Sequence, residues 1–163
     1  MNKKILLIIV LAFICIMGVY SVSHSRENFD GIFEMDVPHG QHFEDKASCL
    51  PNGKLGCIKE YWEVDSGCQM DEGDIVVFYY DDSYLVDGES NSWEHSINTL
   101  TGTYFYKNPK YVGKLLILTN DLGSTSMPPY IVGVHNDEGN KVVFVGGYHL
   151  EDLMKYANSV EFK

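Results

Sequence analysis

Residues 130–162 read YIVGVHNDEGNKVVFVGGYHLEDLMKYANSVEF, and this stretch decides the expected fold. Two runs rich in β-branched residues, 130–134 and 142–145, flank the polar segment 136–140. Two such runs joined by a short segment with Asn, Asp and Gly are typical of a β-hairpin. A hairpin alone is only marginally stable in water, so we expect further strands and a covering helix elsewhere in the chain.

The segment after this hairpin predicts an amphipathic helix. Its apolar residues fall at i, i+3, i+4 and i+7, which places them on one helical face. These residues are Leu150, Leu153, Met154 and Ala157. Val160 and Phe162 then predict a last short edge strand, and we expect the helix to pack across one face of the sheet.

The central part of the chain supplies the remaining strands. Residues 75–80, IVVFYY, are apolar on both faces, which favours a central strand that is covered on both sides. The fold class is therefore α+β, an antiparallel sheet of about five to seven strands with the C-terminal helix on one face. The other expected elements are strands at 33–37, 59–64, 84–86, 103–106 and 112–119, a loop at 44–54, a turn at Asn108–Pro109, and a short helix at 93–100 capped by Ser90 or Asn91.

The closing segment VVFVGGYHLEDLMKYANSVEF, residues 142–162, resembles the hairpin, helix and strand that end many small exported prokaryotic proteins of unknown function. The resemblance consists mainly of apolar spacing. It implies the same fold and an extracytoplasmic location, and it implies no catalytic residue.

The first residues predict export from the cytosol. Lys3 and Lys4 precede the apolar run 5–19, the pattern of a charged n-region followed by a hydrophobic h-region. The run shows no polar stripe, so we expect an N-terminal hydrophobic helix that enters the membrane and not a buried core helix.

Whether this segment is cleaved stays open at the level of sequence. Short residues around 19–23 suit a signal peptidase, whereas residues 5–22 would form roughly 27 Å of helix against roughly 30 Å of hydrocarbon. We therefore assign residues 1–24 to a signal peptide or membrane anchor, and residues 25–163 to an extracytoplasmic domain. If uncleaved, the chain contacts the membrane through residues 5–22.

The exported part is strongly acidic. It carries 10 basic and 23 acidic residues, a net charge of −13, because Lys3 and Lys4 belong to the leader. Such a surface repels phosphate backbones, which argues against nucleic acid as a partner. It suits solubility, cationic partners or divalent ions.

Three cysteines remain after export, which indicates one disulfide and one leftover thiol in an oxidising compartment. Cys49 and Cys57 lie symmetrically about a Pro-Asn-Gly turn centred on Gly53. A hairpin there would set them opposite each other, so we favour Cys49–Cys57 as the disulfide, with pairs that involve Cys68 as the alternative.

Chemical motifs are scarce. His39 and His42 lie three residues apart and could hold a metal on a helix, but Pro38 and Gly40 favour a loop, where this spacing specifies nothing. An enzyme would need a thiol near a histidine, and Cys68 is the expected odd cysteine. No nucleophile elbow or phosphate-binding glycine loop occurs. We therefore lean away from an enzyme, and we expect no cofactor.

Aromatic residues are the more suggestive feature. If exposed beside carboxylates, they could stack on sugar rings or form a protein-binding hot spot, whereas cross-strand pairing inside a sheet is the simpler explanation. We expect a non-enzymatic domain that binds an envelope glycan or protein, with a small extracytoplasmic enzyme or a metal-binding protein as the alternative. The candidate binding residues are Trp62, Tyr79, Tyr80, Tyr84, Trp93, Tyr104 and Tyr106.

Overall fold

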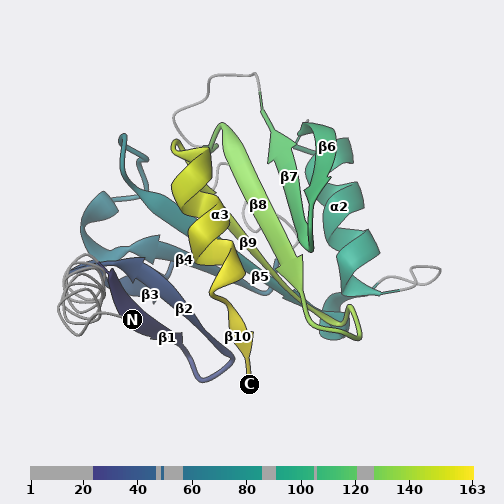
Figure 1. The fold of residues 1–163 in the computed structure, drawn as a ribbon, viewed down its shortest axis with the longest axis horizontal. Helices are drawn as coiled ribbons and strands as arrows, with labels where there is room; N and C mark the ends of the chain where they lie inside the picture. The colour runs from purple at the N-terminus through teal and green to yellow at the C-terminus, as the bar shows by residue number, and fades with distance from the viewer. Residues whose placement is uncertain (1–23, 47–48, 50–56, 86–90, 105, 121–126) are drawn as a thin grey trace, which may run out of the picture.

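The computed structural model describes residues 24–46, 49, 57–85, 91–104, 106–120 and 127–163. Two antiparallel sheets, two helices and two short 3₁₀ turns make up this part of the chain, as Figure 1 shows. The α+β class with a C-terminal helix is therefore confirmed. The predicted hydrophobic helix at 5–22 lies outside the described residues, and none of the helices described is long and apolar enough to cross a membrane.

The larger sheet has seven strands in the order β3-β4-β5-β9-β8-β7-β6. Every neighbouring pair in it is antiparallel. The strands are β3 (Phe43–Asp45), β4 (Lys59–Glu63), β5 (Ile75–Asp81), β6 (Lys107–Val112), β7 (Leu115–Thr119), β8 (Tyr130–His135) and β9 (Lys141–Gly147).

A three-stranded sheet and α3 cover one face of the larger sheet. The small sheet has the order β1-β2-β10, with β1 (His24–Phe29), β2 (Phe33–Pro38) and β10 (Glu161–Phe162). Helix α3 (Leu150–Asn158) lies across β8 and β9 (Figure 1). Phenylalanines of β1 and β2 share a core with Leu153 and Ala157 of α3.

The other face is covered by α2 (Ser92–Gly102), which packs on β5 and β9. Leu100 is fully buried there against a second apolar core. The helix begins at Asn91, whose Oδ1 accepts a hydrogen bond of 2.9 Å from the Glu94 amide, so the predicted cap at Ser90 or Asn91 is Asn91.

Strand β5 shows why the two cores form. Its residues alternate between them, with Ile75, Val77 and Tyr79 on the α3 side and Val76, Phe78 and Tyr80 on the α2 side. Since both faces are buried, the prediction of a central strand covered on both sides is confirmed.

The hairpin predicted from residues 130–145 and the amphipathic helix predicted after it are also confirmed, as β8, β9 and α3. Asn136 organises the turn, because its Oδ1 accepts hydrogen bonds from the amides of Asn140 and Lys141. Gly133 of β8 lies against the ring of Phe144 of β9, where a Cβ would sit 2.3 Å from the nearest ring carbon. Glycine is therefore required for this close approach of side chain and backbone.

Several predicted boundaries are wrong. At the expected strand 103–106, the described residues 103, 104 and 106 are not in a strand, because α2 extends to Gly102 with Thr103 as its C-cap. The strand instead runs through the expected Asn108–Pro109 turn as β6, with an irregularity between Lys107 and Lys110. At the expected strand 84–86, the chain ends the 3₁₀ turn η2 (Asp82–Tyr84), and Val86 lies outside the described residues.

Two short strands were missed. No strand was expected at β1, and β3 overlaps the start of the expected loop at 44–54. Another 3₁₀ turn, η1 (Val64–Ser66), follows β4 directly. It reverses the chain through Gly67 and Cys68, which both have positive φ angles.

Candidate functional site

The predicted aromatic patch does not form on the surface. Trp62, Tyr79, Tyr80 and Tyr106 are each at most 3% exposed. Burial raises the pKa of the Tyr80 and Tyr106 hydroxyls well above the ordinary value. The prediction of exposed binding residues is therefore wrong for these four. Trp62, Tyr79 and Tyr80 lie on strands β4 and β5 of the large sheet, both faces of which are covered. Tyr106 lies in the connection just before β6.

Of the other candidate aromatics, Trp93 and Tyr104 are partly buried. Trp93 of α2 stacks on the ring of Phe144, with 5.8 Å between the ring centroids and 8° between the planes. Tyr104 also packs against the core on the α2 side. Tyr84 closes η2, and its side chain lies outside what is described. Trp93 and Tyr104 therefore contribute to the core on the α2 side.

The prediction of one disulfide is confirmed, but the favoured Cys49–Cys57 pairing is wrong, and the alternative, a pair that involves Cys68, is the one formed. Cys49 is bonded to Cys68, with 4.9 Å between their Cα atoms, and Cys57 is fully buried. The turn after η1 brings Cys68 back to Cys49, so the pairing follows the path of the chain beyond β4 and not the symmetry of the Pro-Asn-Gly segment. Cys68, the thiol that the enzyme hypothesis used, therefore cannot act as a free nucleophile.

His39 and His42 are exposed in the connection between β2 and β3. The Nδ1 atom of His42 lies 3.8 Å from a carboxylate oxygen of Glu27. No cluster of three or more histidine, cysteine or acidic side chains able to hold a metal occurs within the described ranges.

A buried carboxyl group lies in the core on the α2 side. Glu60 of β4 is completely buried, and its Oε1 accepts a hydrogen bond from Nε1 of Trp62. Its Oε2 has no hydrogen-bond partner in the described part of the chain. Burial, followed by repulsion from Asp45, raises the pKa of Glu60 to about 7, although the bond from Trp62 opposes this shift.

Tyr80, Tyr104 and Cys57 are close enough to Glu60 or to one another to interact electrostatically. A thiol, a carboxyl group and two phenols could in principle perform acid–base chemistry. Cys57 and Glu60 are both fully buried, however, whereas reactive cysteines are at least partly exposed. This cluster therefore affects stability and does not form an accessible active site.

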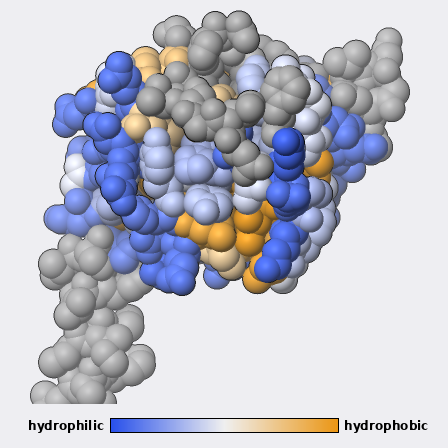
Figure 2. Space-filling view, turned by 90° about the horizontal axis from the view of Figure 1, so that it is seen from above, coloured by the Kyte–Doolittle hydropathy of each residue, from blue (hydrophilic) through white to orange (hydrophobic). Residues whose placement is uncertain are grey.

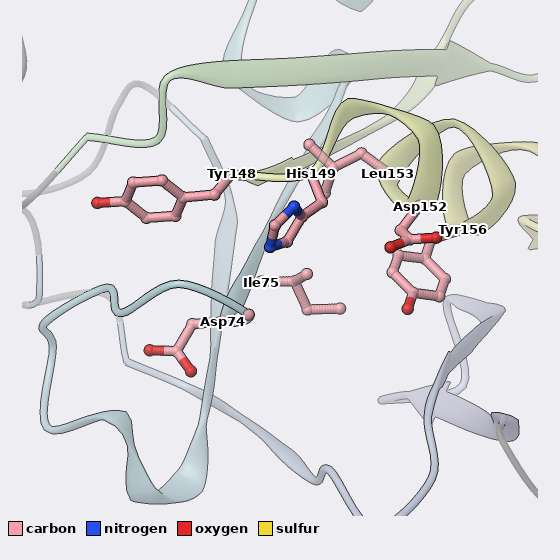
Figure 3. Close-up of a pocket in the computed structure, with 8 residues that line it drawn as sticks. Asp74, Ile75, Tyr148, His149, Asp152, Leu153 and Tyr156 are labelled. Carbon is pink, nitrogen blue, oxygen red and sulfur yellow. The ribbon is translucent and has the colours of Figure 1, made fainter.

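A small pocket lies where α3 meets the end of the β4–β5 connection (Figure 3). Its volume is about 90 Å³, and its lining includes Asp74, Ile75, His149 and Asp152. His149 lies above Ile75 near the centre, whereas the Tyr148 ring is directed away from His149 (Figure 3). Pockets for small organic ligands usually measure roughly 300–1,000 Å³, so this one suits only a few water molecules or a very small group.

The outer strand β6 is the most unusual surface feature. It ends the seven-stranded sheet, and all six of its residues are exposed. Tyr111 is 59% exposed and Val112 40%, and the only other large apolar side chain exposed to this degree in the described part is Val64. An edge strand offers unpaired backbone N–H and C=O groups to another chain.

This edge is also basic. Lys107, Lys110 and Lys114 are exposed, and no described carboxylate lies within ion-pair distance of them. Arg26, Lys59, Lys155 and Lys163, in contrast, each contact a carboxylate; Arg26, for example, contacts Asp36 at 3.1 Å and Glu161 at 2.8 Å. We call the surface formed by residues 107–114 the basic edge.

The sequence contains one signal for the basic edge, a long stretch without acidic residues. Residues 95–120 hold no aspartate or glutamate, although the whole chain has 23 of them. What the pattern could not show is that β6 is the last strand of the sheet.

A shallow groove of about 360 Å³ lies beside the basic edge, between α3 and the start of β7. Leu115 and Met154 supply its apolar surface, and Lys155 and Asn158 lie at its side. Figure 2 shows hydrophilic side chains over much of the molecule seen from above, with apolar surface gathered among them.

No known relative was found. No protein-family model matches the chain, and neither curated proteins nor solved structures gave a similar one. The resemblance to small exported prokaryotic proteins therefore remains a prediction.

Proposed function

We propose that this chain is an extracytoplasmic, non-enzymatic interaction domain, secreted or held at the membrane by residues 5–22, and that the basic edge contacts its protein partner. The observation that carries this proposal is an edge strand whose six residues are all exposed, two of them large and apolar. Three lysines at this edge have no acidic partner among the described residues. Addition of an extended segment to a sheet edge is a common mode of peptide recognition.

Export is supported by the leader and by the Cys49–Cys68 disulfide, because disulfides persist mainly outside the reducing cytosol. A binding role is supported over a catalytic one by the small pocket and by the burial of the Glu60 cluster. A glycan partner has less support, because most of the aromatic residues proposed for stacking are buried.

Lysine and proline at a sheet edge also protect proteins against edge-to-edge aggregation. This protective role and partner binding predict different results. A merely protected edge would contact no specific protein, whereas a binding edge would contact one partner reproducibly.

The test is site-specific photo-crosslinking in the producing cell. A benzoylphenylalanine replaces Tyr111 in one variant and Val64 in a control. Val64 is 42% exposed, but it follows β4, which has a neighbouring strand on each side. We expect one crosslinked exported protein, identified by mass spectrometry, at position 111 and not at position 64. Equal labelling at both positions, or none at 111, would overturn the proposal.

A further inference from the structure

We infer that the basic edge takes an extended acidic segment, in which acidic side chains alternate with apolar ones, as an eighth strand of the large sheet. This inference rests on the proposed function and names the chemistry of the partner. It follows from three features of β6: its register, the direction of its backbone groups and its charge.

The register places the charged side chains on one face. Lys107 lies opposite Thr119 and Lys110 opposite Ile117, so both lysines share the α3 side of the sheet. Tyr111 lies opposite Leu116, which belongs to the core on the α2 side. A strand added beside β6 would therefore meet positive charge on one face and an exposed aromatic ring on the other.

The hairpin turn fixes which backbone groups face outward. Gly113 has φ of +60° at the first position of a two-residue turn between Val112 and Leu115. In such a hairpin the pair next to the turn, here Val112 and Leu115, is hydrogen-bonded. Along an antiparallel ladder, hydrogen-bonded pairs then alternate with pairs that share no hydrogen bond. Lys110 is thus bonded to Ile117, while the N–H and C=O of Tyr111 point away from β7.

Pro109 has no N–H group, so the outer edge offers its strongest backbone contact at Tyr111. The length available for pairing is short. Side chains must therefore contribute to the affinity, and cross-strand pairs of opposite charge or of an aromatic with a β-branched residue are favourable.

Charge selects the sign of the partner. The whole chain has a net charge of −11, yet the basic edge carries three lysines without described acidic partners. A second copy of this chain would bring its own negative charge but also the same lysines. A separate acidic segment complements the edge without that repulsion.

An anionic lipid surface fits the geometry less well. The described chain begins with β1, which lies on the opposite side of the molecule from β6 (Figure 1). A domain held by residues 5–22 would therefore turn the basic edge away from the bilayer that holds it. The partner is accordingly a protein segment.

The probe is a fluorescein-labelled peptide, Val-Glu-Val-Glu-Val-Glu-Val, and binding is measured by fluorescence anisotropy with the full-length protein in a neutral detergent. Two control peptides keep the length: Val-Gln-Val-Gln-Val-Gln-Val removes the charge, and Val-Val-Val-Val-Glu-Glu-Glu keeps the charge but loses the alternation. We expect the alternating acidic peptide to bind most tightly. Its affinity should fall when salt rises from about 50 mM to about 300 mM, because exposed charges are screened.

Matched protein variants locate the site. The double variant Lys107→Gln/Lys110→Gln should weaken binding about fivefold, while Lys141→Gln/Lys163→Gln removes the same charge elsewhere and should have no such effect. Tyr111→Ser should also weaken binding. Circular dichroism of each variant establishes that it is folded.

Four results would overturn the inference. These are no binding of the alternating acidic peptide, equal binding of the peptide without alternation, an equal loss in both double variants, or stronger binding to vesicles of phosphatidylglycerol than to the peptide. A second copy of this chain is the remaining possible occupant of the edge, and sedimentation of the protein alone tests it. Self-association that is lost when Lys110 is replaced would assign the edge to a second copy. If the peptide fails but the Tyr111 crosslink still joins one protein, only the acidic-strand inference falls and the proposed function stands.

Discussion

Replacing Glu60 by glutamine should change how the stability of the domain depends on pH. Glu60 is fully buried, and burial raises its pKa from 4.5 to about 7. Glutamine keeps an oxygen that can accept the hydrogen bond from Trp62, and it has no charge to bury. The substitution therefore removes the titration with little change in shape.

The sign follows from proton linkage. Between pH 4.5 and about 7 the folded protein keeps the Glu60 proton while the unfolded chain has lost it. The free energy of unfolding therefore falls as the pH rises through this window. Above about pH 7 Glu60 is ionised in both states, so its titration no longer changes the free energy of unfolding. A shift of about 2.5 pKa units corresponds to about 3 kcal/mol.

The assay is urea unfolding followed by tryptophan fluorescence at several pH values, with the disulfide intact. The stability of the Glu60→Gln variant relative to wild type should rise by about 2–3 kcal/mol between pH 4.5 and pH 8. Glu44→Gln is the control, since Glu44 is exposed on the neighbouring strand β3. A difference between variant and wild type that stays constant across this range would refute the buried, neutral Glu60.

Two further substitutions test the fold. Cys68→Ser opens the Cys49–Cys68 bridge, which closes a loop with a sequence separation of 19. The substitution should lower the free energy of unfolding, measured by urea titration, by about 3 kcal/mol. A loss below about 1 kcal/mol would contradict the pairing. Gly133→Ala places a Cβ against Phe144 and should cost about 1–3 kcal/mol by the same assay. Its control, Gly102→Ala at the end of α2, meets no atom within 4 Å and should change stability by less than about 1 kcal/mol, so equal effects of the two alanines would argue against the tight contact.

The elements with regular apolar spacing were predictable from sequence. Strand β5 and the pair β8 and β9 are rich in β-branched residues, and α3 carries a clear helical stripe. Strand β1 was missed because its sequence HSRENF is mostly polar, and only Phe29 is buried. Its strand conformation depends on pairing with β2, a tertiary effect that local composition does not reveal.

Strand β6 was displaced for a different reason. Asn108 and Pro109 are typical turn residues, but here they form an irregularity inside an edge strand, where Asn108 has φ of +53°. Proline has no N–H group to donate to a neighbouring strand. It is tolerated at that place because β6 is the last strand of the sheet, so no hydrogen bond between strands is lost on its outer side. Edge position is set by strand order, so the sequence could not distinguish this edge from a loop.

The candidate site was mispredicted because aromatic content does not report exposure. Tyr79 and Tyr80 are consecutive residues of β5, and alternation buries one in each core because both faces of the sheet are covered. The disulfide depended in the same way on long-range geometry. Cysteine spacing limits the possible pairings, but the path of the chain between the cysteines chooses among them.

The backbone of Tyr111 offers the most direct test of the central claim, that β6 is an open edge which receives a partner strand. Hydrogen exchange measured by NMR should find the Tyr111 amide unprotected in the protein alone, while the Lys110 amide, bonded toward β7, is already protected. Addition of the alternating acidic peptide should then slow exchange at Tyr111 and leave Lys110 unchanged. A Tyr111 amide that is protected before the peptide is added, or that stays unprotected when the peptide is bound, would contradict the claim.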